Sequence, residues 1–368
     1  MKKLLALLMA IALTFQLVTP VFAEEIEETQ AATEAVEVET EAPVTEAPTT
    51  EPPVPETAAP EETSAPTEPQ PTTEVTEATE TTASTEETTS AASALDLFAE
   101  DGNVIASGTC GAQGDNLTWT LTEDGTLTIS GSGYMKNYST SSVAPWYTKR
   151  AKILSVVVED GVTSIGSCAF KDCLKLASVT LPEGMKSIGS RGFQNCTKLA
   201  EVTIPDSVTS ISNYAFQGCS SLTSVSIPEG VTSIGEGAFW GCSSLTSVTI
   251  PEGVTKIEGG TFYGCTKLES VTLSEGLQRI KDACYDDVYF YVHYGVFENC
   301  TSLKNIEIPD SVTSIGRCAF WGCSSLTSVT IPESVTKIEG GTFYGCTKLE
   351  SVTLPEGLLS IETYNGYG

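Results

Sequence analysis

Apolar residues recur along the second half of the chain with a fixed spacing of 23 residues. One unit runs from Val231 to Gly253 and has the sequence VTSIGEGAFWGCSSLTSVTIPEG. Its apolar positions are Val231, Ile234, Ala238, Phe239, Cys242, Leu245, Val248 and Ile250. Equivalent units start at Val162, Met185, Val208, Val231, Val254, Leu277, Val312 and Val335, and a partial ninth starts at Leu358. This self-similarity predicts a solenoid of stacked coils, with eight complete repeats.

Each unit contains two segments with the pattern of a short strand. Residues 247–250 alternate polar and apolar side chains and are rich in β-branched residues, which indicates a half-buried strand that ends at Pro251. Residues 231–234 predict a second strand. The segment around Phe239 is too short for a stable helix and predicts a helical or 3-10 turn. Because one coil cannot bury its apolar side alone, we expect a parallel β-sheet along the stack.

The segment before the repeats has a different pattern and predicts a β-rich cap over residues 95–152. Residues 117–121 and 127–129 alternate apolar and polar side chains on either side of a Glu-Asp-Gly turn. This pattern is typical of a β-hairpin. Since the terminal units of a solenoid must be covered, we expect the hairpin to cap the open apolar end of the solenoid, which then extends over residues 153–368.

The first 94 residues predict two further segments. Residues 1–23 have two lysines, an apolar run and a small-residue end at Ala23, which predicts a secretory signal peptide. An uncleaved membrane anchor is the alternative, although the apolar run is short for a full span. Residues 24–94 hold 19 Glu and no Lys, Arg, Asp or His, and they predict a disordered stalk that is either bare or O-glycosylated.

The spacing of the cysteines argues against the disulfides that their number alone would suggest. The chain has 12 cysteines, a number that in a secreted protein suggests disulfides. Eight of them, here called the ladder cysteines, occupy one repeat position: Cys173, Cys196, Cys219, Cys242, Cys265, Cys300, Cys323 and Cys346. A cysteine at one fixed position per coil predicts a row of buried thiols that pack as small apolar side chains. Cys110, Cys168, Cys284 and Cys318 lie off this row, and their redox state stays open.

The unit A-F-x-G-C-x-x-L-x-x-V-x-I-P-x-G-V-x-x-I resembles the BspA-type leucine-rich repeats of bacterial surface proteins, over about residues 153–368. Residues 118–133 resemble the module that often precedes those repeats. The resemblance implies a right-handed leucine-rich-repeat solenoid displayed outside the cell, in a family associated with adhesion to host matrix proteins, host cells or other bacteria. It carries over no catalytic residue.

Little in the sequence points to chemistry. The chain has one histidine, His293, and no nucleophile elbow, phosphate loop or His-Glu-x-x-His spacing. The cysteines lack the paired Cys-x-x-Cys spacing of a zinc site. We therefore expect no enzyme activity, no cofactor and no metal. The net charge of −29 argues against nucleic acid and anionic membranes as partners.

Three surfaces are candidates for binding an extracellular protein or glycan. The first is the polar side of the strand face, with Ser247, Thr249, Ser328 and Thr330 as examples, although these positions also serve solubility. The second is the insertion at residues 282–295, which lengthens the sixth unit to 35 residues and holds Tyr285, Tyr289, Phe290, Tyr291, His293 and Tyr294. Its aromatic side chains either contact a partner or pack back onto the coils.

The third candidate surface is the variable position after the repeated phenylalanine. It holds Trp240, Tyr263, Trp321 and Tyr344, so that two aromatic pairs fall on neighbouring coils and are suited to stacking, including on a sugar. Residues 238–273 and 319–354 are identical apart from Gly253 against Ser334, which indicates a duplication that copied the second pair.

These observations favour a secreted or cell-surface interaction protein, an adhesin for matrix protein, mucin or other glycan, or another cell. Two alternatives stay open. One is a structural protein of the cell envelope or biofilm that associates with itself. The other is a targeting module of a longer extracellular enzyme, of which this chain would be a truncated part.

Overall fold

The computed structural model describes residues 103–286 and 291–363, with backbone alone for 284–286 and 291–293. The predicted signal peptide, the predicted stalk, Tyr289 and Phe290 lie outside the described residues. Within them the chain is a parallel β-solenoid of about nine turns with almost no helix. None of the described helices is long and apolar enough to cross a membrane.

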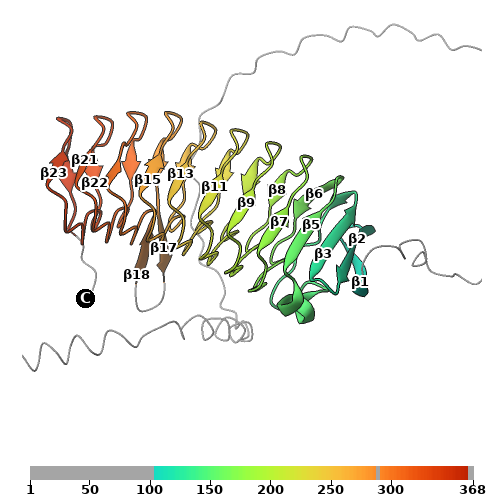
Figure 1. The fold of residues 1–368 in the computed structure, drawn as a ribbon. Coiled ribbons are helices and arrows are strands. Elements are labelled where there is room, and N and C mark those ends of the chain that lie inside the picture. Colours follow the sequence, from blue (N-terminus) through green and yellow to red (C-terminus); the bar gives the residue numbers. More distant parts are fainter. Residues whose placement is uncertain (1–102, 287–290, 364–368) are drawn as a thin grey trace, which may run out of the picture. The chain divides into compact units, whose positions relative to one another are not determined.

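The cap forms the first strands of the solenoid's own sheet. Strands β1 (Val104–Gly111), β2 (Gly114–Thr122) and β3 (Thr126–Gly131) are antiparallel, which confirms the predicted hairpin. Strand β3 then pairs in parallel with β5 (Ser155–Val158), the first strand of the coils. The hairpin therefore covers the end of the stack by continuing its hydrogen bonding, and Figure 1 shows this cap at the teal end of the row of coils.

Each coil contributes two short strands, which form two rows along the solenoid (Figure 1). The first row contains β5, β7 (Ser178–Thr180), β9 (Glu201–Thr203), β11 (Ser224–Ser226), β13 (Ser247–Thr249), β15 (Ser270–Thr272), β19 (Asn305–Ile306), β21 (Ser328–Thr330) and β23 (Ser351–Thr353). The second follows β4 (Gly133–Tyr134) and contains β6 (Val162–Ile165), β8 (Ser187–Ile188), β10 (Ser210–Ile211), β12 (Ser233–Ile234), β14 (Lys256–Ile257), β16 (Arg279–Ile280), β20 (Ser314–Ile315), β22 (Lys337–Ile338) and β24 (Ser360–Ile361). Paired strands in both rows are parallel and match equivalent repeat positions.

The third side of each coil consists of short turns that do not join into a helix, in line with the short turn expected at this position. Alternate amides of this segment have different partners. The Trp240 amide donates to the carbonyl of Gly237, three residues earlier, at 3.0 Å, whereas the Phe239 amide donates to the carbonyl of Thr261 in the next coil, at 2.9 Å. Because every second amide bonds between coils, no helical run forms. The one helical element among the described residues is η1 (Tyr147–Lys152), which precedes the coils.

Two positions on the turn side have left-handed backbone. The second of these positions directly precedes each ladder cysteine, and φ there lies between 59° and 74°. It is occupied by Asp172, Asn195, Gly218, Gly241, Gly264, Asn299, Gly322 and Gly345. Glycine, asparagine and aspartate tolerate this conformation best. This explains why the position before each ladder cysteine is restricted to three residue types, although it lies at the surface.

The core contains parallel rows of Val, Ile, Leu, Phe and Cys side chains, and two of these rows distinguish this solenoid. The phenylalanine row consists of Phe170, Phe193, Phe216, Phe239, Phe262, Phe297, Phe320 and Phe343. Neighbouring rings stack with centroids 5.2–5.6 Å apart, and the buried ring of Trp146 begins the row, 5.5 Å from Phe170. Such stacked aromatic contacts add to the free energy gained from burying the rings.

The ladder cysteines are free thiols beside the phenylalanine row, and all of them are buried, as predicted, except Cys346, which is half-buried. From Cys196 to Cys346, each thiol donates a hydrogen bond to the carbonyl of the phenylalanine in the preceding coil, with sulfur–oxygen distances of 3.1–3.3 Å. Burial raises the pKa of the Cys265 thiol to about 12. The Cys265 thiol thus remains protonated, and the bonded thiols of the row link one coil to the next.

Candidate binding surfaces

The first row of strands presents a flat face of hydroxyl groups. Ser247 and Thr249 are exposed on either side of the buried Val248, and they pair in register with Ser270 and Thr272 of the next coil. Ser328 and Thr330 have the same exposed positions on β21. One predicted surface is thus a regular array of outward-facing Ser and Thr side chains.

The hydroxyl groups next to this array are used within the solenoid. The Thr246 hydroxyl donates to the carbonyl of Thr223 at 3.3 Å, and the Thr327 hydroxyl donates to the carbonyl of Lys304 at the same distance. Each such bond joins adjacent coils. Side chains at this position therefore serve the fold, whereas those of Ser247 and Thr249 point away from it.

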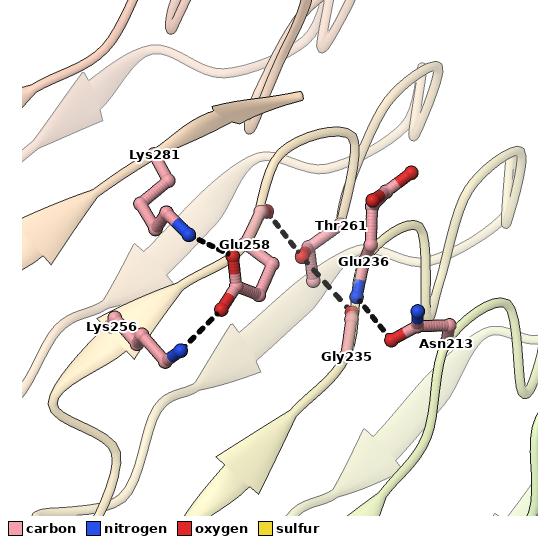
Figure 2. Close-up of polar contacts among 7 residues, drawn as sticks. All are labelled: Asn213, Gly235, Glu236, Lys256, Glu258, Thr261 and Lys281. Atoms are coloured by element: carbon pink, nitrogen blue, oxygen red, sulfur yellow. Dashed lines mark hydrogen bonds and ion pairs between the residues drawn. The ribbon is translucent and has the colours of Figure 1, made fainter. Parts of the chain in front are cut away.

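The second row of strands carries charges that neutralise one another. In Figure 2, Glu258 lies between two lysines, with its two carboxylate oxygens each 2.7 Å from the amine of Lys256 or Lys281. Lys337 makes equivalent ion pairs with Glu339 and Glu362. These groups are partly exposed, so each pair adds little stability. Because its charges are paired, this side offers a weak field to a charged partner.

Neutral side chains near these ion pairs also join the coils. Figure 2 shows the Asn213 side-chain oxygen accepting the amide of Glu236 at 3.1 Å, and the buried Thr261 hydroxyl directed at the carbonyls of Glu258 and Gly235, at 2.6 and 3.4 Å. Polar positions that vary between coils are therefore used to satisfy backbone groups. Among the three predicted surfaces, the insertion and the aromatic positions are therefore the ones that differ most from the repeated coil.

The insertion in the sixth coil is a β-hairpin. Strands β17 (Asp282–Asp286) and β18 (Tyr291–Gly295) are antiparallel, with Asp282 opposite Gly295 and Asp286 opposite Tyr291. Figure 1 shows the hairpin extending beyond the coils. The backbone of Tyr285, Tyr291 and His293 lies in these strands, and their side chains are outside the described part of the chain.

Tyr294 packs the base of the hairpin onto the coils. Its ring is half-buried and lies edge-on to both Trp240 and Tyr263, with centroids 4.6 and 5.5 Å apart. Trp240 and Tyr263 stack on each other at 4.2 Å with an interplanar angle of 27°. These three residues, here called the hairpin cluster, combine the second and third surfaces predicted from the sequence into one.

The duplicated pair has the same stacking in a different setting. Trp321 and Tyr344 have centroids 4.1 Å apart and an interplanar angle of 27°. The Tyr344 ring is 62% exposed, whereas Tyr263 is half-buried beneath the hairpin. In both pairs stacking covers one face of each ring, which leaves fewer aromatic faces open to a sugar.

Two features of this region were not found from the sequence. The Tyr214 hydroxyl donates to the carboxylate of Glu236, and the guanidinium of Arg191 lies 5.5 Å from the centre of the Tyr214 ring. Glu298 occupies the position that holds Trp240 and Tyr263 in the two preceding coils. Burial raises the pKa of Glu298 to about 7, although the amide of Gly295 donates to its carboxylate at 3.1 Å.

We expect Glu298 to make the protein more stable in mild acid. Its pKa is raised in the folded state above the ordinary value of about 4.3, so folding favours the protonated carboxyl. This contribution is complete below about pH 4 and is lost as the pH rises through about 7. The free energy of unfolding, measured with urea at pH 5 and pH 8, should therefore fall less between these values in E298Q than in the wild type.

The exposed Glu252 provides the control for this measurement. The E252Q variant removes one exposed carboxylate away from the hairpin and so measures the general effect of losing one negative charge. An E298Q variant with the same pH dependence as the wild type would show that Glu298 titrates normally.

No group of three or more His, Cys, Asp or Glu side chains in the described part of the chain is arranged to hold a metal ion. The surfaces of the described part present hydroxyl groups on the strand face, paired aromatic rings and a projecting hairpin.

The comparisons with known proteins concern the repeats. A family model described as "BspA type Leucine rich repeat region" matches residues 146–258, 186–290 and 289–365, with six copies of the repeat. No curated protein matches the chain.

Several solved structures are similar to the chain. A leucine-rich repeat protein from Eubacterium ventriosum is 21% identical, with 70% of this chain and 93% of that chain covered and a TM-score of 0.37. The T. pallidum leucine rich repeat protein is 29% identical over 60% of this chain and 91% of that one, with a TM-score of 0.43. A leucine rich cell surface protein from Faecalibacterium prausnitzii is 25% identical over 67% and 94%, with a TM-score of 0.25.

Proposed function

Because the chain belongs to the BspA-type leucine-rich repeat family, we propose that it is a secreted or cell-surface interaction protein that binds an extracellular partner through the side of its solenoid. The predicted signal peptide and the acidic segment that follows it support a location outside the cell. The repeated coils supply a rigid scaffold, and the partner is a matrix protein, a mucin or another extracellular protein or glycan.

The observation that carries this proposal is the sixth-coil hairpin. The coils stack across it without change, because Arg279 pairs with Ser314 as Lys256 pairs with Arg279 one coil earlier. The rings of Phe262 and Phe297 also keep the common spacing of 5.6 Å. Since the fold does not need these residues to continue, a role in recognition accounts for their presence.

The hairpin cluster gives the surface a suitable composition. Tryptophan and tyrosine are enriched among the residues that contribute most to protein–protein affinity, because they bury a large area at little cost in side-chain entropy. Trp240 and Tyr263 are held by stacking on each other, and Tyr294 holds the hairpin against them. The covered ring faces favour a protein partner over a sugar.

Binding of the full chain to immobilised matrix proteins and mucin tests the proposal. We expect W240A to weaken the affinity about tenfold or more, which corresponds to about 1.4 kcal/mol. The matched control is W321A, because residues 238–273 and 319–354 differ at one position and Tyr344 is exposed where Tyr263 is half-buried. Equal effects of the two substitutions, or no binding anywhere in the panel, would contradict the proposal.

A further inference from the structure

Charge is divided unevenly along the folded part of the chain. Residues 132–200 contain nine Lys and Arg against four Asp and Glu, a net charge of +5. Residues 201–368 contain eight against nineteen, a net charge of −11. The first coils therefore differ in sign from the rest of a strongly acidic protein, and such a local excess attracts ligands of opposite charge.

Three lysines in this region form a column. Ala177 donates its amide to the carbonyl of Leu154 at 2.8 Å, which aligns Lys152 with Lys175 on the next coil. The Thr197 hydroxyl donates to the carbonyl of Leu174 at 3.3 Å, which aligns Lys175 with Lys198 in the same way. With parallel rungs about 4.8 Å apart, the column is about 10 Å long.

The column is exposed and lacks neutralising partners. All three lysine side chains are exposed, and no ion pair is recorded for any of them within the described ranges. The same position in later coils holds Ser221, Ser244, Lys267, Ser302, Ser325 and Lys348, so consecutive lysines are confined to the first coils. Adjacent like charges repel one another, and an anionic ligand would relieve that repulsion.

The 3-10 helix η1 places further basic groups beside the column. Lys152 is its last residue, and Lys149 and Arg150 precede it. The Arg150 guanidinium lies 4.0 Å from the centre of the Tyr147 ring and donates to the Tyr147 carbonyl at 2.9 Å. This contact fixes the position of the guanidinium, so less side-chain entropy is lost when a ligand binds.

A small cavity adjoins η1. It has a volume of about 100 Å³, and its lining includes Ser139, Thr140, Tyr147 and Lys171. Hydroxyl groups, an aromatic ring and an amine are therefore present together at the end of η1 away from the lysine column. The cavity is large enough for a single sulfate or carboxylate group, and the lysine supplies the opposite charge.

We propose that η1, the lysine column and this cavity form a binding site for a linear sulfated or carboxylated polysaccharide. A single column of lysines about 10 Å long has a suitable length and width to contact one flexible anionic chain. A nucleic acid duplex or a membrane surface extends well beyond the basic coils, and it would be repelled by the acidic residues that follow. This site goes beyond the proposed function, because none of its residues belongs to the hairpin cluster.

Titration of the full chain with fluorescent oligosaccharides of equal length tests the site. The probes are a sulfated heparin hexasaccharide, a carboxylated hexasaccharide without sulfate and a neutral hexasaccharide. We expect at least one anionic probe to bind, and the neutral one not to bind. The triple variant K152Q/K175Q/K198Q should weaken that binding about tenfold or more, and added salt should weaken it in the wild type because mobile ions screen the charges.

A matched variant separates this site from general charge effects. K267Q/K348Q/K256Q removes three lysines from the acidic coils and should change the affinity less than about twofold. Equal losses in the two triple variants, or no binding of either anionic probe, would overturn the proposal. So would single-stranded DNA of equal charge binding as tightly as the glycan. Matrix-protein binding that depends on Trp240 should persist in the K152Q/K175Q/K198Q variant, so that the two proposals fail separately.

Discussion

Replacing Phe239 by alanine is expected to lower the free energy of unfolding by about 3–5 kcal/mol. The ring is fully buried and stacks between Phe216 and Phe262, with centroids 5.5 and 5.6 Å away. Its removal leaves a cavity that both neighbouring coils line. Because each coil of a solenoid is stabilised mainly by its neighbours, the loss affects the stack on both sides. Urea unfolding followed by circular dichroism measures the effect.

The same substitution at Phe343 provides the comparison. That ring is half-buried, and within the described ranges it stacks on Phe320 alone, at 5.6 Å. F343A should therefore cost clearly less than F239A. Equal losses for the two variants, or a loss below about 1 kcal/mol for F239A, would show that the stacked rings do not form the core of the solenoid.

The seven buried ladder cysteines, Cys173 to Cys323, are expected to react with a thiol reagent on the order of a thousandfold more slowly in the folded protein than in urea. Cys242 and Cys265 have no exposed surface, and burial raises their pKa, so that little thiolate is present at pH 8. Reaction then requires the coil to open. Timed alkylation followed by peptide mass spectrometry would give the rate at each position.

Cysteines at less buried positions calibrate this experiment. Cys168 and Cys346 are half-buried and should be modified before the other cysteines of the described part. Ladder cysteines that react as fast as Cys168, or that are already oxidised in the purified protein, would contradict the structure of the core.

The repeating parts of the fold were predictable because one period governs them. Val248 is buried between two exposed hydroxyl residues, and the same alternation recurs in the other coils. This alternation alone indicates a strand. The position of Phe239 and Cys242 likewise follows from the 23-residue spacing, since residues one period apart must lie above one another.

The parts that the sequence did not reveal depend on contacts between coils. The local sequence around Phe239 indicated a short turn, but it did not reveal that the Phe239 amide bonds to Thr261 of the next coil. The raised pKa of Glu298 follows from burial beside the hairpin, an insertion that the sequence did not place against this carboxyl. The lysine column was hidden because Lys152 precedes the first regular unit, and only the pairing of β5 with β7 aligns it with Lys175.

The unbroken register across the hairpin has a consequence for how such proteins diversify. Ile280 pairs with Ile315 although 35 residues separate them, just as Ile257 pairs with Ile280 across 23. The backbone between these anchor points is thus free to lengthen without disturbing the neighbouring rungs. A segment inserted between these two strands is attached to the solenoid at a fixed position. Duplication of whole coils changes the distance between the inserted segment and the cap by one rung for each coil. New specificities can therefore arise by exchanging one short peptide while the remaining scaffold is inherited intact.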